Sequence, residues 1–153
     1  MILFDLKKAE TILKKGDYSN RFIFNYFLVN ALLVTFSLYL ISQDFTSWLL
    51  LLDLSTGFLI TLLGLFYLFN LNENGDKKSF LDRYFVLVLI ISIRVIFLLL
   101  LLFVAYALLD ELFFDFYIDT ESFWFNYTIS SGISLLIYIL LGRSFRRVAN
   151  VKV

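Results

Sequence analysis

Four long apolar stretches, separated by short polar connections, dominate the pattern of residues along the chain. They cover residues 22–43, 48–71, 82–109 and 122–142. Each is apolar on every face, whereas a helix on the surface of a soluble protein has one apolar stripe. At 1.5 Å per residue, each is long enough to cross a hydrocarbon core of about 30 Å. The pattern therefore predicts an all-α integral membrane protein with four transmembrane helices in a single domain, residues 1–153.

The connections carry signals for helix boundaries. The polar run from Asn72 to Lys78 is rich in Asn and contains Gly75, which predicts a turn between the second and third spans. Ser79 followed by Asp82 has the spacing of a capping box, so we expect a helix to start beside Ser79. The chain contains no proline, so we expect continuous spans and not the broken helices of many transporters.

Basic residues are sorted among the connections, and this sorting predicts the orientation of the spans. Of the 13 Lys and Arg residues, all except Arg94 lie before the first span, between the second and third spans or at the very start of the third (Arg83), or after the fourth. Every connection is short, which is the regime of the positive-inside rule. We therefore expect both termini in the cytoplasm. The basic surface predicted there consists of Lys7, Lys8, Lys14, Lys15, Lys77, Lys78, Arg143, Arg146 and Arg147.

Residues 1–16 predict a short amphipathic helix before the first span. Leu6, Ala9 and Leu13 recur at helical spacing between lysines, and Gly16 is placed to end the helix. We expect this helix to lie flat on the cytoplasmic surface of the membrane. The alternative is that it packs against the protein's own cytoplasmic loop.

The composition agrees with a membrane protein and excludes several kinds of chemistry. The chain is 61% hydrophobic and only 17% charged. A soluble domain of 153 residues cannot bury so large a share of apolar side chains, because its surface is large relative to its volume. It contains no Cys and no His, which excludes thiolate metal sites and His general bases. Because no nucleophile–base motif, phosphate loop or metal motif is present either, we expect neither an enzyme nor a bound metal or cofactor.

Two opposite charges lie deep inside the predicted spans, away from their ends. Arg94 follows Arg83 by eleven residues, which places it about 16 Å further along the helix and near mid-membrane. An arginine at that depth costs about 2.5–3.5 kcal/mol on insertion scales. Asp53 on the second span lies near the same level, so we expect Asp53 and Arg94 to pair, within one chain or between copies. The pair would fix helix register, or alternatively line an ion path.

Small polar side chains near the same layer are expected to face one polar interior. Hydroxyl and amide groups inside a membrane form hydrogen bonds between helices. The spacing of Ser130 and Ser134 also permits close approach of two helices. The predicted interior consists of Asn30, Thr56, Thr61, Ser130, Ser131, Ser134 and Tyr138.

These features favour a non-enzymatic protein of a bacterial inner membrane, acting as an anchor, scaffold or sensor subunit of a larger assembly. The expected partners are the lipid bilayer, anionic lipid headgroups, further copies of the chain and a cytoplasmic protein, but no nucleic acid. An association with a cytoplasmic effector, as in antiphage systems, rests on analogy alone. The alternatives are a homo-oligomeric ion channel with Arg94 near the path and, more weakly, a small dimeric transporter.

Overall fold

A computed structural model of the chain describes residues 5–16, 18–41, 48–113 and 123–150. The side chains in these ranges are described except at 35–41, 49–50, 107–113 and 123. All regular structure in the described ranges is helical. The helices are α1 (Leu6–Lys15), α2 (Asn20–Ile41), α3 (Trp48–Glu73), α4 (Phe80–Phe113) and α5 (Phe123–Val148).

Three of these helices contain segments long and apolar enough to cross a membrane. The segments are Leu51–Glu73, Phe80–Tyr106 and Trp124–Val148. The prediction of an all-helical chain with long apolar spans is therefore confirmed for α3, α4 and α5. The first predicted span corresponds to α2, an apolar helix of 22 residues, and its last two predicted positions lie outside the described residues.

Two helix boundaries follow the local signals in the sequence. Gly16 ends α1 in the left-handed conformation, with φ of 75°, and its N–H donates to the carbonyl of Ile12 at 3.0 Å. The helix α4 begins at Phe80, directly after Ser79, as predicted. Ser79 accepts a hydrogen bond from the N–H of Arg83 through its backbone carbonyl, at 3.4 Å.

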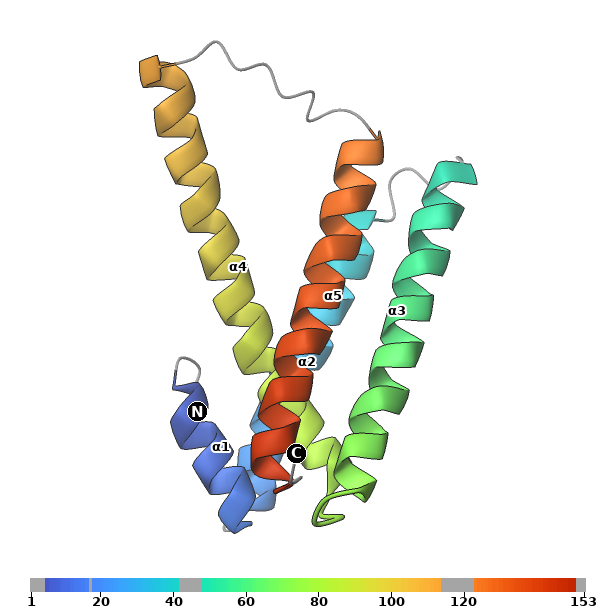
Figure 1. The fold of residues 1–153 in the computed structure, drawn as a ribbon, viewed down its shortest axis with the longest axis vertical. Helices are drawn as coiled ribbons and strands as arrows, with labels where there is room; N and C mark the ends of the chain where they lie inside the picture. Colours follow the sequence, from blue (N-terminus) through green and yellow to red (C-terminus); the bar gives the residue numbers. More distant parts are fainter. Residues whose placement is uncertain (1–4, 17, 42–47, 114–122, 151–153) are drawn as a thin grey trace.

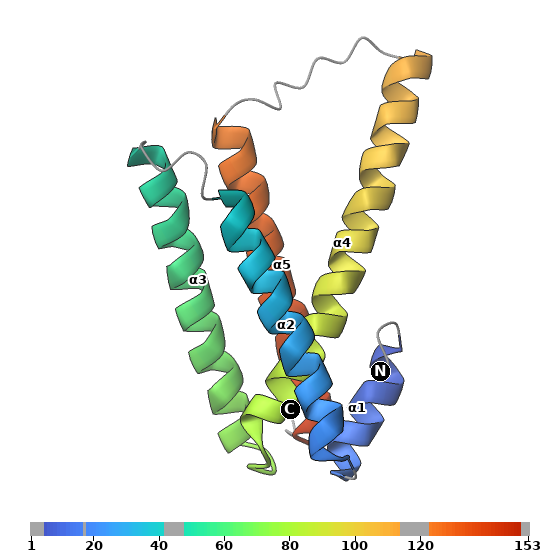
Figure 2. The same ribbon diagram turned by 180° about the vertical axis from the view of Figure 1, so that it is seen from behind.

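The helices gather at one end of the molecule and separate toward the other. The gathered end, here called the basal end, holds α1, the turn between α3 and α4, and the end of α5 (Figure 1). Away from it, α4 leans away from α3 and α5. Figure 2, seen from behind, shows α2 on the face opposite to α5. The most extensive packing joins α3 with α5, and α4 packs against both α2 and α5.

The buried core lies at the basal end. Its fully buried side chains come from all five helices and include Leu13, Tyr26, Leu68, Ile90 and Phe145. Farther from the basal end, α3 and α4 expose large apolar side chains on most of their faces. Lipid tails accommodate such a surface, whereas water would penalise it by about 25 cal/mol for each Å² of apolar area.

The close approach of α3 and α5 depends on two glycines that each face a tyrosine ring. A Cβ added at Gly64 would lie 2.3 Å from the ring of Tyr138, and one added at Gly142 would lie 2.7 Å from the ring of Tyr67. Each helix therefore contributes one glycine and one tyrosine to the contact. Small residues at the point of contact are typical of helices that pack closely within membranes.

The short helix α1 packs against the rest of the chain. Ala9 and Leu13 on its apolar face are fully buried, and the helix contacts α4 and α5. The apolar face that we expected to enter the membrane surface is thus covered by the protein's own helices. This packing agrees better with the alternative of internal packing, although its partners are the basal parts of α4 and α5 and not a loop.

Candidate functional site at the basal end

The predicted basic surface lies at the basal end of the molecule. All nine of its Lys and Arg side chains are exposed. They come from α1, from the turn between α3 and α4, and from the end of α5, which are the elements that meet there (Figure 1). The fold therefore brings together basic residues that are up to 140 positions apart in the sequence.

A buried arginine holds the turn between α3 and α4. The guanidinium of Arg83 is fully buried and donates to both carboxylate oxygens of Asp76, at 2.5 and 2.7 Å, and to the amide oxygen of Asn72 at 2.7 Å. Asn72 in turn donates to the carbonyl of Lys78 at 2.8 Å. The hydrogen bonds from Arg83 lower the pKa of Asp76, so this carboxyl is ionised at neutral pH.

Sequence reasoning missed this cluster, because it counted Arg83 only among the basic residues of a connection. The signal lay in the spacing. Asp76 precedes α4 and Arg83 lies in its first turn, so an arginine side chain that points back toward the start of its helix meets the acid of the preceding turn. The predicted turn is present between α3 and α4 over residues 74–79, and Asn72 lies in the last turn of α3.

The same turn contacts the end of α5. The N–H of Asp76 donates to the carbonyl of Ala149 at 3.1 Å. A Cβ added at Gly75 would lie 2.3 Å from that carbonyl oxygen. Glycine is therefore required at this position because the two backbones approach so closely, and the approach connects α3, α4 and α5 at one point.

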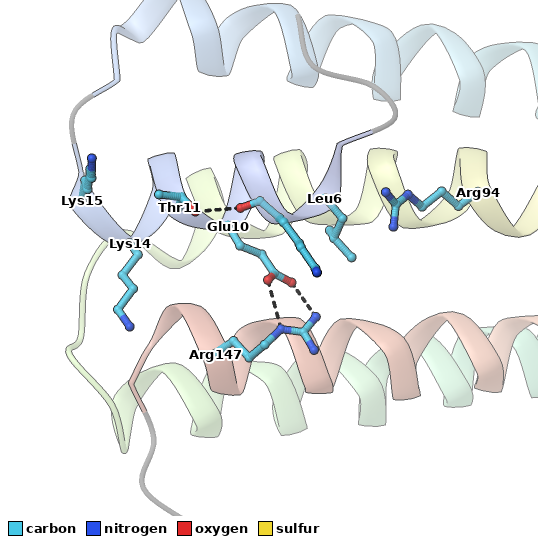
Figure 3. Close-up of a pocket in the computed structure, with 8 residues that line it drawn as sticks. Leu6, Glu10, Thr11, Lys14, Lys15, Arg94 and Arg147 are labelled. Carbon is cyan, nitrogen blue, oxygen red and sulfur yellow. Dashed lines mark hydrogen bonds and ion pairs between the residues drawn. The ribbon is translucent and has the colours of Figure 1, made fainter.

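Polar contacts also connect α1 to the other helices. Arg147 on α5 donates to both carboxylate oxygens of Glu10, at 3.0 and 2.6 Å (Figure 3). The ammonium of Lys78 donates to the carbonyl of Lys14 at 3.2 Å. These contacts hold α1 against the helices on which its apolar face packs.

The segment that follows α1 is joined to α4. The hydroxyl of Tyr18 donates to the carboxylate of Asp82 at 3.1 Å. Burial, followed by the charge of Asp82, raises the pKa of Tyr18, so its hydroxyl keeps its proton at neutral pH. Asp82, which we expected to act in a capping box with Ser79, thus accepts a hydrogen bond from Tyr18, which lies in the segment between α1 and α2.

A cleft of about 770 Å³ lies beside α1, and we call it the basal cleft. Its lining includes Arg94 from α4 and Arg147 from α5 (Figure 3). A smaller cavity of about 200 Å³ shares three lining residues with it and adds Arg143. The basal cleft is lined by Leu6, Lys7, Glu10, Thr11, Lys14, Lys15, Arg94 and Arg147.

The structure does not bring Asp53 and Arg94 together. Asp53 on α3 accepts a hydrogen bond from the hydroxyl of Ser130 on α5 at 2.9 Å. Arg94 is exposed, and its guanidinium extends toward the basal end, next to Leu6 (Figure 3). Within one chain the predicted contact between these two spans does not form, because α4 leans away from α3, so similar depth in the membrane does not make the two residues neighbours. Pairing between copies stays a prediction.

The small polar side chains divide between two helix interfaces and do not form one polar interior. At the interface of α3 and α5, Thr56 and Tyr127 share a hydrogen bond of 3.0 Å between their hydroxyls. At the interface of α2 and α4, the amide of Asn30 donates to the carbonyls of Tyr26 and Phe85, both at 2.9 Å. Tyr138 packs over a glycine of α3, Thr61 is exposed, and Ser131 and Ser134 are half-buried.

The comparisons with known proteins leave the chemistry of the basal end as the main guide to function. No protein family, curated protein or solved structure matches this chain. Within the described residues, no group of three or more acidic side chains is placed to hold a metal ion. The basal cleft instead carries clustered cationic donors, which are suited to binding an anion.

Proposed function

We propose that the chain crosses a bacterial inner membrane four times, with both termini and the basal end in the cytoplasm. The length of α2 supports the fourth span, since 22 helical residues extend about 33 Å. The gathering of nine exposed basic residues at one end supports the orientation. Labelling of single cysteines introduced at positions 8 and 77 by a membrane-impermeant reagent would test it, because only inverted vesicles should react.

We further propose that the protein is a non-enzymatic membrane scaffold that presents its basal end to a cytoplasmic protein. The observation that carries this proposal is the location of the rigid structure. The buried core, the Arg83–Asp76 cluster and the contacts of α1 all lie at the basal end, whereas the parts of α3 and α4 farther away expose apolar side chains. A surface held in one conformation binds a partner with less loss of entropy than a mobile one.

Cross-linking in native membranes tests the scaffold proposal. The basal end carries six exposed lysines, and a lysine-reactive reagent should link a cytoplasmic protein to peptides that contain them. The variant Arg83→Gln should lose the cross-links because it disturbs the buried cluster, while Lys8→Gln should keep them. Recovery of the chain alone, or with only further copies of itself, contradicts the proposal.

Reconstitution distinguishes this function from the alternative of a homo-oligomeric channel. A scaffold should show no conductance in a planar bilayer. A current whose selectivity changes in Arg94→Ala and Arg94→Glu would replace the scaffold proposal with the channel.

A further inference from the structure

The basal cleft concentrates positive charge between three helices. Among the described residues, five basic side chains and one acid line it, which gives this lining a net charge of +4 at neutral pH. The acid is Glu10, and Arg147 already binds both of its carboxylate oxygens. Among the described residues, the lining holds no second acid to offset the ammonium groups of Lys7, Lys14 and Lys15.

Arg94 connects this charged cleft with the apolar surface of α4. Residues three, four and seven positions after Arg94 lie on the same face of the helix, directed away from the basal end. These are Phe97, Leu98 and Leu101, which are 55%, 51% and 51% exposed. The cationic cleft thus continues into an exposed apolar track on the same helix.

The smaller cavity beside the cleft has the same mixed character. It shares Leu6, Arg94 and Arg147 with the basal cleft, and Ile91 and Leu140 add apolar walls. A ligand that satisfies both kinds of surface is anionic at one end and apolar along the rest of its length. A soluble anion would use only the cationic part, and an acidic protein segment would leave the apolar track uncovered.

We propose that the basal cleft binds the phosphate headgroup of one anionic phospholipid, whose acyl chain lies along α4 beyond Arg94. Basic pockets beside membrane helices on the cytoplasmic side are known to hold such headgroups. Lysine and arginine donors supply charge-assisted hydrogen bonds to phosphate oxygens. This inference stands independently of the proposed scaffold role, since a lipid site requires no protein partner.

A bound lipid in this cleft differs from general attraction between a basic surface and an anionic membrane. General attraction depends on the number of charges and treats all exposed lysines at the basal end alike. Binding at a specific site depends mainly on the residues that line that site. The chain offers a matched pair for this comparison, because Lys7 lines the cleft and the adjacent Lys8 does not.

Native mass spectrometry of the full chain in detergent, with added phosphatidylglycerol, tests the site. Each basic residue near an anionic headgroup contributes about fivefold to affinity. The double variant Lys7→Gln/Lys15→Gln should therefore weaken binding of the first lipid by roughly 25-fold. The control Lys8→Gln/Lys77→Gln also removes two positive charges, but outside the cleft, and should change the affinity for the first lipid by less than about twofold. Equal weakening by the two double variants would overturn the proposal.

Arg94 provides an independent measurement should the lysine variant fail to fold. Arg94→Gln should weaken binding by about fivefold, and Arg94→Lys, which keeps the charge, should restore most of it. Circular dichroism of each variant controls for the fold. Unchanged binding in Arg94→Gln would overturn the assignment of this residue.

The source of the phosphate is tested by competition. Phosphatidylcholine, which has no net charge, should bind at least about 25-fold more weakly than phosphatidylglycerol, and inorganic phosphate at millimolar concentration should not displace the bound lipid. Equal binding of phosphatidylcholine, or displacement by inorganic phosphate, would each refute a site for an anionic phospholipid.

Discussion

The substitution Asp76→Asn should destabilise the protein strongly, because it leaves the guanidinium of Arg83 buried without its counter-ion. Arg83 is 0% exposed, whereas the side chain of Asp76 is 19% exposed. Removing one partner of a buried ion pair costs about 3–5 kcal/mol. Since water reaches part of Asp76, we expect the lower end of that range, about 3 kcal/mol.

A double-mutant cycle separates the pair itself from the cost of an unpaired charge. Replacement of buried ion pairs by apolar residues of similar volume is often close to neutral. The variant Asp76→Asn/Arg83→Met should therefore be more stable than Asp76→Asn alone, with an interaction energy of about 1–3 kcal/mol. Reversible unfolding in mixed detergent micelles, followed by circular dichroism, measures each variant.

The matched control is Glu73→Gln, which removes an exposed acid from the end of α3 just before the same turn. It should change the free energy of unfolding by less than about 0.5 kcal/mol. The argument for a buried pair is wrong if Asp76→Asn costs as little as this control, or if the two substitutions of the cycle are additive.

Three further predictions concern other contacts of the bundle. Gly64→Ala should cost about 1–3 kcal/mol because its methyl group meets a tyrosine ring, whereas Gly57→Ala on the same helix meets no atom within 4 Å and should be neutral or stabilising in the same unfolding assay. Glu10→Gln should cost less than about 1 kcal/mol, since the Arg147 side chain is 56% exposed, yet hydrogen exchange in α1 should accelerate. The pKa of Asp76 in the folded protein lies below its usual value of 3.8, so its contribution to stability should be complete at neutral pH and be lost as the pH falls below about 4. The free energies of unfolding of wild type and Asp76→Asn, measured as a function of pH, should therefore converge at acidic pH.

Local signals in the sequence predicted the helices well. Gly16, Ser79 and the polar run before Ser79 correspond to observed helix boundaries. The apolar stretches locate the long helices, although α4 and α5 continue four and six residues past the predicted ends at 109 and 142. These features depend on neighbours along the chain, such as a glycine that adopts positive φ or a serine before a helix. Such information is present in any single sequence.

The side-by-side arrangement of the long helices could not be predicted from such local signals. Depth along a helix axis follows from counting residues, so Asp53 and Arg94 were assigned to the long apolar helices α3 and α4, but equal depth did not make them neighbours within one chain. Which helices are neighbours depends on packing contacts such as Tyr138 over Gly64, which no periodicity reveals. The direction of Arg94 had a local cause that we overlooked, since long side chains on a helix point toward its N-terminus, here the basal end.

The divergence of α4 from α3 and α5 has a mechanical consequence. The helix α4 is 34 residues long, or about 51 Å, and its buried residues lie near the basal end. The helix can therefore be treated as a rigid rod that pivots about the Arg83–Asp76 cluster. A change of about 5° in the tilt of this rod displaces its far end by roughly 4 Å. Tilt is also the response of long helices to bilayer thickness, so we expect the separation of the far ends to change with the thickness of the surrounding membrane.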